Sequence, residues 1–235
     1  MPDSLTTKRL SLVLPAMCLP LLASILYFVI FPGTVFGKSC YVGVKVFLLC
    51  WPIIAAIFLL KERLFPKFEK VQLKKSIIWG TIFGLATFGT MFGLLKFSPM
   101  SEVIYSNGDK IAQKVDDLGV AEHFILFGIF ISFLHAALEE FFWRLFVFGQ
   151  LRKTMPWVTA MIIGSLGFAA HHIVILSQFV PIGWAVFFGL CVGLGGAVWC
   201  IIYQKTNTLW GAWVSHMIID LAIFWIGWEV LQMQV

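Results

Sequence analysis

Charged residues are scarce in this chain. Only 12% of its 235 residues are charged, whereas 60% are hydrophobic. A soluble domain of this length needs far more charge to cover its surface. The hydrophobic residues form runs of about 20, the length that crosses a bilayer as a helix, and they lack the strict alternation of a transmembrane barrel. The scarcity of charge therefore excludes a soluble protein and predicts a helical membrane protein with several spans.

Several sequence signatures are also missing, and each absence removes a class of protein. The five cysteines include no CxxC pair and no Cys/His finger spacing, so neither a disulfide framework nor a zinc finger is indicated. No HExxH, no GxSxG or GxSG, and no GxGD motif occurs. Zincin, serine and aspartyl types of intramembrane hydrolase are therefore excluded.

The apolar segments predict an all-α bundle of seven transmembrane spans. Their expected ranges are 10–31, 41–60, 77–97, 123–151, 157–176, 182–203 and 209–231. A polar connecting segment, 98–121, separates the N-terminal transmembrane helices, 1–97, from a helical core, 122–235. We expect all of the buried polar chemistry to lie in that core.

The basic residues predict the orientation of the spans. Segment 61–75 contains six lysines and arginines, and the other loops on the same side contain Lys8, Arg9, Arg152, Lys153 and Lys205. By the positive-inside rule the N-terminus is cytoplasmic and the C-terminus lies on the opposite side. The net charge of +5 follows mostly from this bias and indicates no nucleic-acid partner. We expect a multi-pass protein of a bacterial cytoplasmic membrane, in contact with lipid.

Two neighbouring glutamates lie inside the fourth predicted span. Glu139 and Glu140 are followed one helical turn later by Arg144. A charge in hydrocarbon costs roughly 2.5–3.5 kcal/mol on insertion scales, so these residues are either functional or paired. Residues four apart share a helix face, which predicts an ion pair between Glu140 and Arg144. Glu139 points about 100° away from Glu140, on the face that it shares with His135.

The other intramembrane polar residues lie in the fifth and seventh spans. We expect Glu139 to converge with His172, His216 and Asp220 near the middle of the membrane, and His171 to point elsewhere. A carboxylate beside an imidazole can take the proton of a water. A second polar pair can hold the oxyanion that forms when water attacks an amide. The same four residues also suit zinc, and the sequence does not choose between these sites.

Three motifs on the polar spans resemble those of a known family. They are Glu139-Glu140-Phe-Phe-Trp-Arg144, Phe168-Ala-Ala-His171-His172 and His216-Met-Ile-Ile-Asp220. In this order they resemble the EExxxR, FxxxH and HxxxN or HxxxD motifs of CPBP intramembrane proteases. That group includes the type II CAAX prenyl endopeptidases and bacterial Abi relatives. The resemblance covers residues 120–225 and implies a glutamate-dependent intramembrane endopeptidase, of a kind often classed as a metalloprotease.

The resemblance also implies roles for the motif residues. Glu139 and His172 would activate the water. Glu140 and Arg144 would pair and hold the helix, as structural support of the site. A true CAAX endopeptidase removes a C-terminal tripeptide after a prenylated cysteine, but many bacterial relatives have no such substrate. A membrane-associated peptide or protein is therefore the expected partner, with prenylation left open.

The third motif departs from the commoner family pattern. The resemblance assigns His216 and Asp220 to the oxyanion, but Asp220 stands where an amide-bearing Asn is more usual. An ionised Asp cannot donate a hydrogen bond. Asp220 must therefore be protonated, orient His216, or bind a metal such as zinc.

Two other functions also fit the sequence. A non-proteolytic scaffold or immunity protein could retain the same residues. An ion-coupled transporter also places acids and histidines inside its spans. The transporter is disfavoured because the chain shows no pair of broken-helix repeats.

Overall fold

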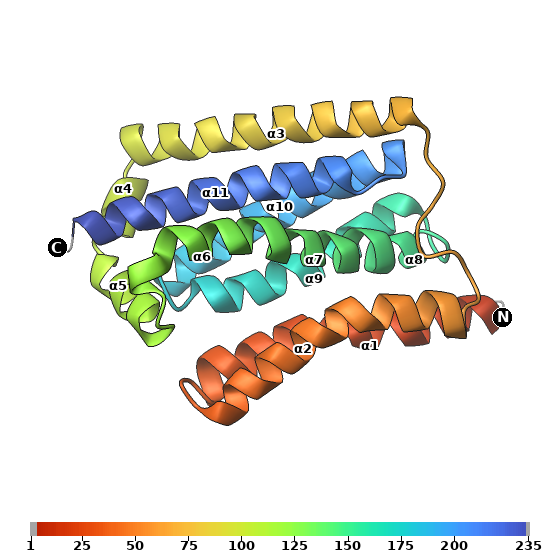
Figure 1. Cartoon of the computed structure of the whole chain (residues 1–235), viewed down its shortest axis with the longest axis horizontal. Helices are drawn as coiled ribbons and strands as arrows, with labels where there is room; N and C mark the ends of the chain where they lie inside the picture. The colour runs from red at the N-terminus through yellow and green to blue at the C-terminus, as the bar shows by residue number, and fades with distance from the viewer. Residues whose placement is uncertain (1–3, 234–235) are drawn as a thin grey trace.

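In the computed structural model, which describes residues 4–233, seven long helical segments lie roughly along the longest axis of the molecule (Figure 1). Those long and apolar enough to cross a membrane are Ser4–Ile30, Val35–Leu59, Lys70–Phe97, Ala121–Leu151, Trp157–Leu176, Ile182–Thr206 and Trp210–Gln232. The described residues contain no strand. The predicted all-α bundle of seven spans is therefore confirmed, while the outermost limits of the two predicted domains, residues 1 and 235, lie outside the described range.

The first three spans precede the two glutamates. α1 (Ser4–Ser24) and α2 (Val35–Ile53) each continue into a π-helical turn, at Ile25–Ile30 and Ile54–Leu59, respectively. α3 (Lys70–Phe97) is a single long helix. The polar connecting segment folds into two short helices, α4 (Met100–Tyr105) and α5 (Gly108–Asp117).

The fourth span alternates between helix types. Its parts are a 3-10 turn Ala121–His123, α6 (Phe124–Phe130), a π-helical turn Ile131–His135, α7 (Ala136–Glu140), a π-helical stretch Phe141–Phe148 and α8 (Gly149–Leu151). The short helix α7, which contains both glutamates, is thus flanked by π-helical turns on each side. Such turns are frequent at functional sites.

The remaining helices pack in pairs around the fourth span. α9 (Trp157–Leu176) lies along α10 (Ile182–Thr206), and α11 (Trp210–Gln232) lies along α3. α1 and α2 form a pair on the other side of the fourth span, where α1 also contacts α9. α7 thereby has neighbours on both sides, α2 on one and α11 on the other.

The centre of the bundle is the second half of the fourth span. Every residue from Phe142 to Phe148 is buried. Phe168 of α9 and Trp199 and Tyr203 of α10 are among the buried residues that pack with it. In a bilayer, close packing rather than removal from water holds such helices together, so this core fixes the helices that position the glutamates.

Glycines bring two helix pairs into close contact. A Cβ atom added to Gly211 of α11 would overlap the carbonyl oxygen of Ser76 in α3. The Gly211 N–H donates to the Ser76 hydroxyl oxygen at 3.0 Å. Likewise, a Cβ atom on Gly189 of α10 would overlap the side chain of Ile173 in α9. The absence of side chains at these glycines therefore sets the helix spacing.

One end of the bundle is joined by a polar network. Glu62, in the loop between α2 and α3, forms ion pairs with Arg9 of α1 at 2.5 Å and with Lys153 after α8 at 2.8 Å. Arg9 also donates to the side chain of Gln150. The hydrogen bond from Arg9 lowers the pKa of the Glu62 carboxyl from 4.5 to about 2. Three segments that we predict to lie on the cytoplasmic side thus meet at one end, while the orientation itself stays a prediction.

Candidate active site

Glu139 is buried at the centre of a cluster of basic side chains. Its Oε1 atom lies 3.0 Å from His135 Nε2, 3.4 Å from Lys45 Nζ and 3.5 Å from His171 Nε2. Its Oε2 atom lies 3.9 Å from His172 Nε2. Within the described residues, Oε2 has no hydrogen-bond partner. The carboxylate is therefore held at one oxygen and free at the other.

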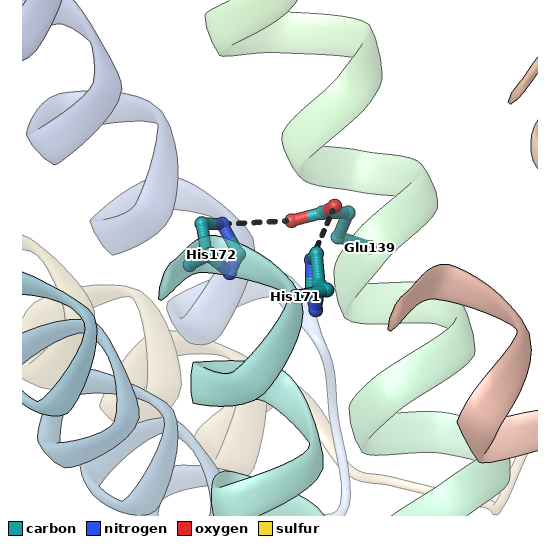
Figure 2. Close-up of side chains that lie close together, drawn as sticks. All are labelled: Glu139, His171 and His172. Carbon is teal, nitrogen blue, oxygen red and sulfur yellow. Dashed lines mark ion pairs between the residues drawn. The ribbon is translucent and has the colours of Figure 1, made fainter. Parts of the chain in front are cut away.

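The prediction that His171 points away from this group is wrong. Neighbouring residues on a helix diverge by about 100°, but the Glu139 carboxylate faces α9 and approaches both imidazoles (Figure 2). The two rings have centroids 4.1 Å apart, and each ring approaches a different carboxylate oxygen. Both histidines of the second motif thus belong to the Glu139 cluster.

Glu140 is the centre of a second cluster. Its Oε2 atom lies 2.8 Å from Arg144 Nε, so the predicted ion pair is present. Its Oε1 atom accepts a hydrogen bond from His216 Nδ1 at 2.8 Å. The other ring nitrogen of His216 lies 3.6 Å from Asp220 Oδ1. Glu140 therefore contacts two basic side chains at once, Arg144 from its own span and His216 from α11.

Phe168 lies between the two clusters. Its ring centroid is 4.5 Å from that of His172 and 6.0 Å from that of His216. The Arg144 guanidinium lies 4.4 Å from the same ring and 4.7 Å from the ring of Trp199. Trp199 also stacks on His216 at 4.4 Å. Aromatic faces thus fix both the guanidinium and the imidazole that contact Glu140.

The four predicted site residues therefore belong to two adjacent clusters. Glu139 approaches His172 of α9, whereas His216 and Asp220 of α11 are joined to Glu140. The two glutamates face different helices because consecutive residues diverge around the helix axis. Joint action of the two clusters on one substrate stays a prediction.

Lys45 is a member of the Glu139 cluster that was not among the predicted site residues. This lysine lies in α2, in the N-terminal part of the chain, and its side chain is 23% exposed. Arg9 of α1 is also buried. The expectation that all buried polar chemistry lies in residues 122–235 is therefore wrong. The available signal was a lone lysine within the apolar run of the second span.

A cavity opens beside the second cluster. It has a volume of about 220 Å³ and lies between the loop after α2, the fourth span and the start of α11. Glu140 lines it together with Phe65, Leu145, Trp210 and Trp213. The walls are mainly apolar, so this space suits hydrophobic groups next to the buried ion pair.

Three residues of the Glu139 cluster could hold a metal ion. The ligand atoms of Glu139, His171 and His172 all lie within 4.8 Å of one another. Two imidazoles and one carboxylate form the protein ligand set of several catalytic zinc sites, which leave a fourth position for water. The donor set therefore fits a divalent metal.

The segment that contains the motifs of both clusters matches a known protein family. Residues 121–222 match a family model described as Type II CAAX prenyl endopeptidase Rce1-like. Over these residues the chain is similar to that family. The resemblance to the CPBP group is thereby confirmed, and the Rce1-like segment supports a CAAX-type intramembrane protease in general. Searches of curated proteins and of solved structures find no match.

Proposed function

We propose that this integral membrane protein hydrolyses a peptide bond of a membrane-associated substrate, with Glu139 taking the proton of the attacking water. The free Oε2 atom of Glu139 carries this proposal. It lies 3.9 Å from His172 Nε2. A water oxygen placed about 2.8 Å from both atoms would form an angle of about 90° between Glu139 Oε2 and His172 Nε2. This angle is compatible with one hydrogen bond to each atom. The gap thus suits one bridging water.

The tautomer of His172 also supports a water that bridges Glu139 and His172. His172 Nδ1 lies 2.9 Å from the carbonyl oxygen of Phe168, which can only accept a hydrogen bond. In a neutral His172 the proton is therefore on Nδ1, and Nε2 presents a lone pair. A water between Glu139 Oε2 and His172 Nε2 would donate one hydrogen to each. Its own lone pair would then face away from both, toward a substrate carbonyl.

The proposed reaction has two steps. In the first, the water oxygen bonds to the carbonyl carbon, one water proton moves to Glu139 Oε2, and the carbonyl electrons move to the oxygen. In the second, the carbonyl re-forms and the carbon–nitrogen bond breaks. Glu139 then passes its proton to the leaving nitrogen. A general base of this type contributes about 10²- to 10⁴-fold to the rate.

We further propose that His216 and Asp220 stabilise the oxyanion. A His216 protonated on both nitrogens would donate Nδ1–H to Glu140 and leave Nε2–H for the oxyanion. Asp220 Oδ1 lies 3.6 Å from the same Nε2 atom, beyond hydrogen-bond distance, so it does not occupy this donor. Of the three alternatives that the sequence left open, a protonated Asp220 is the one that would give the oxyanion a second hydrogen bond.

If a divalent metal such as zinc is bound, Glu139, His171 and His172 would hold it. The metal would polarise the carbonyl and lower the pKa of a bound water. The zinc content of the purified protein, compared with that of a His171→Ala variant, tests this ligand set by mass spectrometry.

The chain as a whole is organised around this chemistry in our proposal. Residues 122–235 form the catalytic core, 98–121 connect it to the N-terminal helices 1–97, and the N-terminus is cytoplasmic in a bacterial membrane. The substrate to test first is a farnesylated peptide with a C-terminal CAAX sequence, beside the same peptide without the prenyl group.

The decisive experiment measures cleavage of these peptides by purified protein in liposomes. Glu139→Gln and His172→Ala should each lower cleavage by at least about 100-fold, because the water loses its base or its second acceptor. Glu122→Gln and His123→Ala are matched controls, since both side chains are exposed in the same segment. Cleavage by Glu139→Gln at more than a tenth of the wild-type rate would refute the mechanism.

The natural substrate requires a separate search. Glu139→Gln keeps the shape of the side chain and removes its basicity, so it should retain bound substrate without cutting it. Peptides that co-purify with Glu139→Gln but not with wild type identify the substrate by mass spectrometry.

A further inference from the structure

Lys45 reaches Glu139 from a helix outside the Rce1-like segment. It belongs to α2, whereas the matched residues are 121–222. Its Nζ atom lies 3.4 Å from Glu139 Oε1 and 3.4 Å from His135 Nε2. The same ammonium lies 5.2 Å from the ring of Tyr41. Its surroundings are therefore the Glu139 cluster and an aromatic face.

The partial burial of Lys45 has an electrostatic reason. A lysine inside a membrane span is costly unless it reaches water or a negative charge. Lys38, two turns earlier on α2, is exposed, whereas the Lys45 side chain is only 23% exposed. Glu139 is the only carboxylate paired with Lys45 among the described residues. The lysine is thus the partner that compensates the charge of the buried carboxylate.

The contact also determines which oxygen of Glu139 is free. Lys45, His135 and His171 all approach Oε1. Oε2 is left facing His172. If Lys45 were absent, the strongest positive charge on Oε1 would be lost, and the carboxylate could rotate about its last bond. Oε2 would then leave the position from which it takes a proton.

A role for Lys45 in binding the C-terminus of a substrate does not fit this geometry. In a CAAX peptide the terminal carboxylate is three residues from the cleaved bond, which corresponds to about 10 Å in an extended chain. Lys45 Nζ is 3.4 Å from the carboxylate that we propose as the base. It is therefore placed to act on Glu139 rather than on the end of the substrate.

We infer that Lys45 is a positioning residue for Glu139, holding Oε1 so that Oε2 faces His172 and the attacking water. This inference rests on the proposed function of Glu139. It means that α2 completes the active site, although the family motifs lie wholly in the later spans. The N-terminal helices are then part of the catalytic machinery rather than a separate membrane anchor.

The first test compares three lysine variants in the farnesyl-peptide assay. Lys45→Met should lower kcat by about 10- to 100-fold and change KM by less than twofold, because a small displacement of a catalytic group costs that much. Lys45→Arg keeps the charge and should restore most of kcat. Lys38→Met is the matched control on the same helix and should behave as wild type. A wild-type kcat in Lys45→Met would overturn the inference.

The second test examines the contact without relying on activity. Lys45→Met is made in wild type and in Glu139→Gln, and the apparent Tm of each protein is measured in detergent. In wild type the substitution leaves a buried carboxylate short of a partner and should lower Tm by about 2 to 8 °C. In Glu139→Gln the lysine has lost its own partner, so its removal should leave Tm unchanged or raise it. Equal losses in both backgrounds would overturn the inference.

The two tests separate this inference from the proposed function. Retained cleavage by Glu139→Gln would refute the function of Glu139, and with it the positioning role. Loss of cleavage in Glu139→Gln, together with wild-type kcat in Lys45→Met, would refute the role of Lys45 alone. If wild type cleaves neither peptide, the proposed substrate is wrong, and the Tm comparison still decides whether Lys45 holds Glu139.

Discussion

Replacement of Arg144 by Met should destabilise the bundle strongly. The side chains of Arg144 and Glu140 are only 2% and 1% exposed, and Arg144 Nε lies 2.8 Å from Glu140 Oε2. Met fills much of the same volume but carries no charge. The variant would leave the Glu140 carboxylate buried, with His216 as its remaining basic neighbour.

The expected cost is dominated by this uncompensated charge. Removing one partner of a buried ion pair typically costs about 3–5 kcal/mol, whereas removing both is often nearly neutral. The lost contacts of the guanidinium with Phe168 and Trp199 add about 0.5–2 kcal/mol. The double variant Arg144→Met/Glu140→Gln removes both charges and keeps an oxygen that can accept from His216 Nδ1. It should regain at least half of the stability that the single variant loses.

Thermal unfolding in detergent, followed by tryptophan fluorescence, measures both variants. At about 2–4 °C per kcal/mol for a chain of this size, Arg144→Met should lower the apparent Tm by about 7 to 28 °C. Arg152→Met provides a control, because that arginine is only partly buried and its hydrogen bonds go to neutral side chains. A double variant no more stable than the single one would show that packing, and not the unpaired carboxylate, sets the cost.

Two further predictions concern the end of the bundle and the helix contacts. Because the folded-state pKa of Glu62 is about 2, below its usual 4.5, its ion pairs stabilise the protein fully above pH 4.5 and are lost as the pH falls toward 2. The difference in Tm between wild type and Glu62→Gln should therefore shrink over that range; a difference independent of pH would contradict this assignment. Gly211→Ala should lower Tm markedly, since its Cβ would overlap the backbone of Ser76. Gly89→Ala, which meets open space among the described residues, should leave Tm unchanged or raise it slightly, and equal losses in the two variants would refute the close contact.

Several features of this protein follow from local sequence alone. Apolar run length predicts the seven spans, because a helix must cross the full hydrocarbon thickness. The pair of Glu140 and Arg144 is equally local, since residues four apart meet on any helix. The motif order predicts the family, which the match over 121–222 confirms. In each case the information lies within one helix or in the order of the helices.

The partners between helices were decided only by the tertiary structure. Helix geometry separates His171 from His172 by about 100°, but it does not say where the facing carboxylate lies. The position of α7 against α9 brings Glu139 close to both rings, whereas His216 contacts Glu140. Lys45 joins the site because α2 packs on α7, a contact that depends on the relative rotation and depth of two helices nearly a hundred residues apart. The sequence thus determined which helices cross the membrane, and helix packing determined which side chains meet.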